Sequence, residues 1–376
     1  MVLTYLAQRY VLQHLEANRR FLFAARCPPI FRIDKRIPLQ ISSLRFSDDA
    51  ILINEICFRF SSYRFQVQET AEQRRLRQSK ALRSGEVLLK VDETPIYSTY
   101  VQVTYQLRGE SLKISRSRRL PAYFKDKDEA LSEFLGILLR GRRVIKIGWL
   151  NIYQITSSVI KIPRNCPRLH VRSIHMYQHN VTRIKKLLDH KSFPLNHIMI
   201  YSWEEAYGKD RMITEADCVG FVASRSHNST EYWYEVILKA RNRMVKMWKL
   251  EFSMEQILDL IGNLVEKGRY IGSGYVLECS ELKNLKKILK KAKERYGGAK
   301  VTLVEPKDNE TIATKVISIP FATPTESEIV VYGIEVEIDG EKKKKKYKII
   351  IKVMKKGSTT SVAKKKKKIF GIPWFN

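Results

Sequence analysis

Histidines are the residues of this sequence best suited to metal binding, and five of the seven lie between residues 166 and 197. His175 and His179 are four residues apart, a spacing that places two metal ligands on one face of a helix. The segment Leu169–Met176 is typical of a strand, however, and residues four apart in a strand are separated by about 13 Å. There is no HExxH motif and no second Cys/His pair. We therefore predict structural histidines, with no metal site and no cofactor.

A second candidate is the glycine-containing stretch KGRYIGSG at residues 267–274, which has the composition of a phosphate-binding loop. Such a loop needs a strand before it and the N-terminus of a helix after it. Here a helical pattern ends at Gly268 and a strand pattern follows, so we predict a helix stop and a turn. Because no GxSxG motif, activated nucleophile or carboxylate pair is evident, the sequence favours a protein that is not an enzyme. An enzyme without a known motif stays an alternative.

Charge is the strongest feature of the composition. The 376 residues include 69 Lys and Arg against 39 Asp and Glu, a net charge of +30. Residues 281–376 hold 24 basic and 11 acidic side chains, so 24 − 11 = +13 of this charge lies in the last quarter. A basic field attracts polyanions such as nucleic acid, acidic proteins or anionic membranes. The five scattered cysteines form no CxxC pair, which indicates free thiols.

Two lysine runs contribute much of the C-terminal charge. The first, Lys342–Lys346, follows Asp339-Gly340, and a two-residue hairpin there would place Glu335 opposite Lys344. The second lies in a Ser/Thr/Lys tail and is a candidate nuclear-import or polyanion-binding site, with solvated charge as the alternative. It consists of Lys364, Lys365, Lys366, Lys367 and Lys368. A basic cluster at Arg116, Arg118 and Arg119 falls in a predicted loop over residues 108–127.

The hydrophobic patterns predict an α+β or α/β fold: an antiparallel, strand-rich N-terminal part, then alternating helices and strands, then a C-terminal β-hairpin. Among the expected helices is one over residues 231–249, and Ser253 with Gln256 predicts a capping box for the next. We expect five regions along the chain. They are a helical segment (1–30), a strand-rich region (31–127) with a polar linker at 68–84, an α/β region (128–300), strands (301–357) and a basic tail (358–376).

At the N-terminus the spacing predicts two short helices, the second capped by Asn18 and ended by Cys27-Pro28-Pro29. The first helix carries a spaced apolar set that could dock in a groove of a partner or cover the adjoining sheet. This set is Leu3, Leu6, Val11, Leu12 and Leu15. No signal-peptide pattern and no membrane-length apolar run is present, so we expect a cytoplasmic or nuclear protein with no membrane span.

Four segments resemble the nematode-specific F-box C family, which joins an F-box-like N-terminus to a C-terminal domain of unknown function. They are LTYLAQRYVLQHLEANRRFLFAARCPPI with DKRIPLQISSL (3–44), LHVRSIHMYQHNVTRIKKLLDHKSFPL (169–195), LIGNLVEKGRYIGSGYVL (260–277) and SEIVVYGIEVEI (327–338). The resemblance implies a substrate-recognition adaptor of an SCF-type ubiquitin ligase. Its expected partners are a Skp-type linker and an unknown target protein. A basic protein that binds nucleic acid or another polyanion is the alternative.

Overall fold

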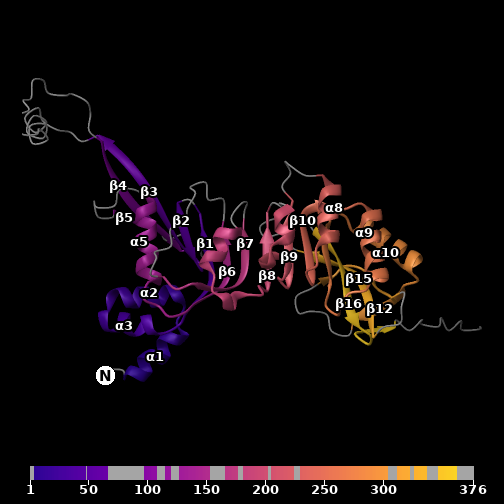
Figure 1. Cartoon of the computed structure of the whole chain (residues 1–376), viewed down its shortest axis with the longest axis horizontal. Helices are drawn as coiled ribbons and strands as arrows, with labels where there is room; N and C mark the ends of the chain where they lie inside the picture. The colour runs from indigo at the N-terminus through magenta and orange to yellow at the C-terminus, as the bar shows by residue number, and fades with distance from the viewer. Residues whose placement is uncertain are drawn as a thin grey trace, which may run out of the picture. The chain divides into compact units, whose positions relative to one another are not determined.

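The chain has helices and mixed β-sheet and is therefore α+β, in agreement with the coarse prediction. The computed structural model describes residues 4–47, 49–66, 97–107, 115–119, 127–152, 166–176, 181–201, 205–223, 229–303, 311–321, 326–336 and 346–361. Two compact units are present (Figure 1). Unit 1 comprises Met1–His175 with Val181–Ser192, and unit 2 comprises Met176–Asn180 with Phe193–Asn376.

Unit 1 begins with three short helices and continues into strands. Its helices are α1 (Tyr5–His14), α2 (Ala17–Arg26), α3 (Pro28–Arg36), α5 (Lys127–Leu139), α6 (Val181–Leu187) and the 3₁₀ turn η1 (His190–Ser192). Its strands are β1 (Leu39–Phe46), β2 (Ala50–Ile53), β3 (Ile56–Gln66), β4 (Tyr97–Leu107), β5 (Ser115–Arg119), β6 (Ile145–Ile152) and β7 (Leu169–Met176). The pairing order β5-β4-β3-β2-β1-β6 is antiparallel except for β1 and β6, which run parallel.

Helix α5 packs against β3 through aromatic side chains. The ring centroid of Phe134 lies 4.7 Å from that of Phe58 and 5.5 Å from that of Phe60. Phe60 and Ala130 are buried at this contact, with Leu131 packed beside them. This contact fixes the position of α5, whose C-terminal end is used by the site described below.

Unit 2 alternates strands and helices before ending in strands. Its helices are η2 (Glu205–Lys209), α7 (Arg211–Thr214), α8 (Thr230–Lys239), α9 (Met254–Lys267) and α10 (Leu282–Tyr296). Its strands are β8 (His197–Ile200), β9 (Cys218–Val222), β10 (Met244–Glu251), β11 (Gly274–Cys279), β12 (Ala299–Leu303), β13 (Thr311–Ile312), β14 (Val316–Ile319), β15 (Ser327–Val336), β16 (Lys346–Lys355) and β17 (Thr359–Ser361). Strands β8, β9, β10 and β11 are parallel, whereas β11-β16-β15-β14-β12-β17 is antiparallel.

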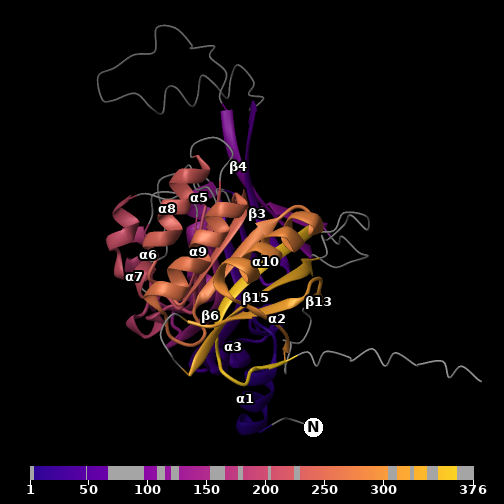
Figure 2. The same ribbon diagram turned by 90° about the vertical axis from the view of Figure 1, so that its right-hand side faces the viewer.

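Helices α8, α9 and α10 lie together on one side of the unit 2 strands (Figure 2). On that face the ring of Phe221 in β9 lies 5.9 Å from the ring of Trp233 in α8. Gly333 in β15 lies against α10 so closely that a Cβ atom there would be 2.2 Å from Cδ2 of Leu285. The predicted capping box at the start of α9 is confirmed, because the Ser253 hydroxyl accepts from Gln256 N and the Gln256 side chain accepts from Ser253 N.

Two predictions of element type are wrong. The helix expected over 231–249 ends at Lys239, and Met244 and Trp248 belong to β10 instead. The Asn242 side chain holds the break, since it donates to the carbonyls of Ile213 and Ala216. The basic cluster at 116–119 forms part of β5 and pairs with β4, so it is not a loop.

The C-terminal strands β15 and β16 pair in a register that differs from the expected two-residue hairpin. Glu335 is opposite Tyr347, three residues beyond the expected Lys344. Val336 pairs with Lys346, so nine residues separate the paired positions. The linker at 68–84, the Asp339-Gly340 turn and Lys342–Lys345 lie outside the described residues.

We predict that the effect of Gly262→Ala on the free energy of unfolding depends on the side chain at position 296. The Tyr296 hydroxyl donates to the Leu258 carbonyl at 2.8 Å, and a Cβ on Gly262 would lie 2.7 Å from the same hydroxyl oxygen. Gly262→Ala should therefore be neutral or destabilising in the wild type. In a Tyr296→Phe background it should raise the free energy of unfolding by up to about 1 kcal/mol, the usual helix preference of Ala over Gly. Urea denaturation of the four chains measures this cycle, and additive effects would contradict it.

Candidate functional site

Residues 5–36 contain three helices, α1, α2 and α3, which we call the N-terminal block. The sequence predicts only two helices, because Pro28-Pro29 is typical of a helix stop. Proline does end α2, but it also begins α3, since a helix tolerates proline in its first turn. The predicted cap of α2 is also wrong: Glu16, one residue before the helix, accepts from the amides of Asn18 and Arg19 at 2.8 and 3.2 Å.

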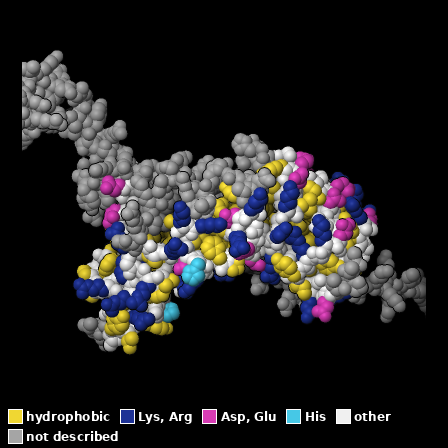
Figure 3. All heavy atoms as spheres, viewed as in Figure 1, with side chains coloured by type: hydrophobic (Ala, Val, Ile, Leu, Met, Phe, Trp, Pro, Cys, Tyr) yellow, Lys and Arg dark blue, Asp and Glu magenta, His cyan; other side chains and the backbone are white. Residues whose placement is uncertain are grey.

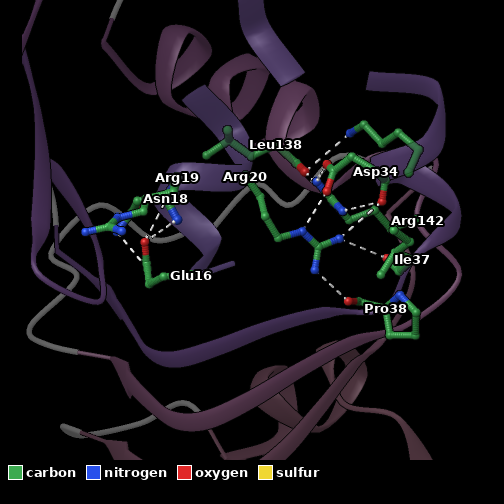
Figure 4. A network of polar contacts seen from close by, with 10 residues as sticks. Glu16, Asn18, Arg19, Arg20, Asp34, Ile37, Pro38, Leu138 and Arg142 are labelled. Carbon is green, nitrogen blue, oxygen red and sulfur yellow. Dashed lines mark hydrogen bonds and ion pairs between the residues drawn. The ribbon is translucent and has the colours of Figure 1, made fainter. Parts of the chain in front are cut away.

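A buried ionic cluster joins the block to the sheet of unit 1. Its members are Arg20 of α2, Asp34 of α3 and Arg142, which follows α5, and we call it the Asp34 cluster (Figure 4). The three side chains are 2%, 0% and 1% exposed. Arg20 Nε donates to Asp34 Oδ1 at 2.7 Å, and Arg142 Nη2 donates to Asp34 Oδ2. The Asp34 carboxylate is therefore shared by Arg20 and Arg142, which are 14 and 108 residues away from it in the sequence.

Backbone carbonyl groups accept further hydrogen bonds from the two arginines. Arg20 also donates to the carbonyls of Asp34, Ile37 and Pro38, at the C-terminal end of α3. Arg142 donates to the carbonyls of Asp34 and Leu138 at 3.1 and 3.0 Å. Helix C-termini carry partial negative charge, so two of them converging here stabilise cations. The chain reverses after α5 at Gly141, whose φ of 75° is costly for other residues.

Lys35 makes a further contact with the same end of α5. Its Nζ atom donates to the carbonyls of Ile137, Leu138 and Arg140 at 2.8, 3.3 and 2.7 Å. Burial, followed by the positive charge of Arg142, lowers the pKa of Lys35 from 10.5 to about 8. Burial also lowers the pKa of Arg142, while the hydrogen bond with Asp34 acts in the opposite direction.

A second, smaller set of contacts ties the block to the hairpin of β2 and β3. Asn18 donates from Nδ2 to the carbonyl of Ile53 at 2.8 Å, and Glu16 accepts from Nδ2 of Asn54. Asn54 adopts φ 52° in the turn, and its Oδ1 accepts from Ser43 N at 3.1 Å. The block is thus attached to the rest of unit 1 at two places, the buried Asp34 cluster and this smaller polar set.

The outward face of the block is apolar. Of the predicted partner-binding residues, Leu6 and Val11 are 72% and 46% exposed, whereas Leu12 is buried at 3% and Leu15 is half-buried. Leu3 lies outside the described residues. The structure thus divides the predicted set between an outer and an inner face of α1. Sequence reasoning missed other exposed apolar side chains of the block, namely Tyr5, Tyr10, Leu22, Phe23 and Phe31, which are 40–66% exposed.

Arginines lie among these apolar side chains, and Figure 3 shows the two types side by side over α1, α2 and α3. Among the exposed arginines are Arg9, Arg26, Arg32 and Arg36. None of these four forms an ion pair or a side-chain hydrogen bond with another described residue. The predicted polyanion site at Lys364–Lys368 lies outside the described residues.

The structure also places parts of the two other candidate sites. His175 lies on β7 as predicted, with its ring 4.7 Å from that of Trp149, and burial lowers its pKa to about 4. His179 is outside the described residues. The stretch at 267–274 is a helix stop and a turn: α9 ends at Lys267, Gly268 and Gly272 adopt φ 62° and 91°, and β11 begins at Gly274. Within the described parts of the chain, no group of three His, Cys, Asp or Glu side chains could hold a metal ion.

The comparisons with known proteins concern the middle of the chain. Residues 126–281 match a family model described as a domain of unknown function, DUF3557. The match extends from just before α5 to the residue that precedes α10. It confirms the domain of unknown function that the resemblance implied, whereas the F-box-like N-terminus and the nematode family stay predictions. No curated protein and no solved structure matches the chain.

The DUF3557 segment therefore contributes Arg142 and the end of α5 to the Asp34 cluster, and residues outside the match contribute Arg20 and Asp34.

The described helices include none that is long and apolar enough to cross a membrane.

Asp34→Ala should lower the free energy of unfolding by about 3–5 kcal/mol, because two buried guanidinium groups lose the carboxylate that they share. The matched control is Asp49→Ala, which removes a carboxylate 3.4 Å from Arg59 in a pair whose side chains are 62% and 43% exposed. That change should cost at most about 1 kcal/mol. Equal losses for the two variants in urea denaturation would contradict the role assigned to Asp34.

Lys35 should give stability a defined pH dependence. Because its pKa is lower in the folded chain than in the unfolded chain, the unfolded chain binds more protons between about pH 8 and 10.5. The contribution of Lys35 to the free energy of unfolding should therefore rise as the pH increases from about 8. Urea denaturation of the wild type and Lys35→Met should show this as a growing difference in favour of the wild type. Lys239→Met, at an exposed lysine of α8, is the control, and a flat difference for Lys35→Met would contradict the assignment.

Proposed function

We propose that this protein is a non-enzymatic adaptor whose N-terminal block binds a protein partner. The observation that carries the proposal is the exposure of Leu6 and Tyr10, at 72% and 66%, one helical turn apart on α1. Leu12, on the inner side of the same helix, is 3% exposed, so α1 is already packed and its outer apolar side chains are not needed for its own core. A contiguous exposed apolar surface is a common mark of a protein–protein interface.

The position of the block supports the same function. The Asp34 cluster and the contacts of Glu16 and Asn18 hold the three helices on unit 1. A docking surface that is already ordered loses less conformational entropy when a partner binds. Three short helices before the first strand at Leu39 also agree with the F-box-like segment that the sequence resemblance implies.

The expected partner is a Skp-type linker of an SCF-type ubiquitin ligase, in which case the protein would recognise a target for ubiquitination in the cytoplasm or the nucleus. The DUF3557 segment would then contribute to the surface that binds this target. This assignment rests on the resemblance of residues 3–44 and on the exposed surface of the block.

A polyanion-binding function is the second candidate. The net charge of +30 favours it, as do the exposed arginines of the block that pair with no other described residue. Binding of nucleic acid through these charges would weaken steeply with salt. We rank it second because phosphate groups give no reason for the exposed Leu6, Tyr10 and Phe23 side chains among the arginines.

Exchange of the exposed apolar pair for charged residues tests the proposal. The full chain should bind a purified Skp-type linker, and Leu6→Asp with Tyr10→Asp should weaken binding at least about tenfold, because carboxylates would be buried against the partner. The matched control is Tyr270→Asp with Ile271→Asp, at positions 63% and 49% exposed in unit 2. Calorimetric titration measures both, with circular dichroism to confirm folding. No binding by the wild type, or equal loss in both variants, would contradict the proposal.

A further inference from the structure

An open pocket lies on the outer side of α3, at the surface of the N-terminal block. It is lined by Pro28, Pro29, Arg32, Ile33 and Arg36. These residues follow helical spacing: Pro28, Arg32 and Arg36 are successive i, i+4 positions, and Pro29 and Ile33 form the neighbouring row. The pocket therefore has two parts, an apolar part made by two prolines and an isoleucine, and a rim that carries two guanidinium groups.

The two arginines of the pocket differ from those on the inner side of the block. Arg20 makes four hydrogen bonds to Asp34, Ile37 and Pro38. Arg32 and Arg36 make no ion pair and no side-chain hydrogen bond with another described residue. Like charges four residues apart on a helix repel each other. The only carboxylate of α3 is Asp34, and its two oxygens are already used by Arg20 and Arg142.

We infer that this pocket binds an acidic segment of a partner protein, with an Asp or Glu carboxylate between Arg32 and Arg36 and an adjoining apolar side chain against Pro28, Pro29 and Ile33. The guanidinium group suits a carboxylate because it can donate two parallel hydrogen bonds. The inference deepens the proposed function and rests on it, since it names the chemistry of the partner that the block binds.

The shape and composition of the pocket favour a protein segment over the other anionic partners. A bilayer is flat at this scale and does not enter a concave site, whereas a side chain does. Duplex nucleic acid would satisfy the arginines with phosphate, but its stacked bases would leave the proline and isoleucine surface without an apolar partner. Unpaired bases stack chiefly on aromatic side chains, and the pocket lining has none. An acidic segment with an apolar residue beside the carboxylate satisfies both parts of the pocket.

A displayed library of random twelve-residue peptides, selected on the full chain, is the probe that tests this inference. The selected peptides should be enriched in Asp or Glu next to an apolar residue. Arg32→Glu with Arg36→Glu should weaken their binding at least about tenfold, because attraction becomes repulsion. Lys283→Glu with Lys287→Glu is the matched control, since it makes the same change in net charge at exposed residues four apart on α10 of unit 2. That control should weaken binding by less than about threefold at physiological salt, where screening acts within about 8 Å.

Several outcomes would overturn the inference. They are an absence of selected peptides, selected peptides no more acidic than the library, or an equal loss of binding in the two charge-reversed variants. Binding to vesicles of equal parts phosphatidylserine and phosphatidylcholine that depends on Arg32 and Arg36, without peptide binding, would assign the pocket to a membrane instead. Failure of the Skp-type linker to bind, with acidic peptides still captured through Arg32 and Arg36, would remove the ligase partner and leave the pocket assignment in place.

Discussion

The placement of the N-terminal helices depends on one buried carboxylate. Asp34 is 0% exposed and accepts hydrogen bonds from Arg20 and Arg142, whose side chains are 2% and 1% exposed. Transfer of charged groups out of water is costly unless each is paired and hydrogen-bonded. The cost here is offset by the carboxylate together with the carbonyls at the ends of α3 and α5. The two helix ends must therefore stay close together for the cluster to exist, which restricts how the block can be oriented.

Arginine has two different roles within the block. The arginine that points inward, Arg20, is fully engaged and fixes the geometry. The arginines that point outward, among them Arg32 and Arg36, lie beside exposed apolar side chains and are available to a partner. Leu12 and Leu6 show the same division for apolar residues, with 3% and 72% exposure. A surface rich in arginine and aromatic side chains on a fixed support has the composition typical of interface hot spots.

Part of this arrangement could be predicted from the sequence. The strand at 169–176 and the capping box of Ser253 have strong local patterns, and the structure has them at the expected positions. The helix expected over 231–249 was too long, because Trp233, Val236 and Ile237 continue into Met244 and Trp248 without a proline or glycine between them. The break is held by contacts distant in sequence: Asn242 donates to the Ile213 and Ala216 carbonyls, and Arg269 donates to the Ala240 carbonyl.

The candidate site was predictable to a smaller extent. Helical spacing identifies the apolar residues of α1, but it does not say which face is covered, because that depends on how α3 packs against it. The third helix was missed because proline is compatible both with the end of one helix and the start of another. Asp34 and Arg142 carry no local signal of their contact, since they are separated by 108 residues and each alone has the pattern of an ordinary surface charge.

Strand β1 also links the block to the DUF3557 segment, because it follows α3 closely in the chain and is hydrogen-bonded to that segment. Only Ile37 and Pro38 separate α3 from β1, and their carbonyls accept from Arg20. The first residue of β1, Leu39, donates its amide to the carbonyl of Val144, two residues after Arg142. Strand β1 then pairs in parallel with β6 of the matched segment. A partner that moved α3 would have to break the Asp34 cluster or shift this strand pair, and both are costly. The block is therefore expected to bind its partner as a rigid surface, with little reorganisation of its own backbone.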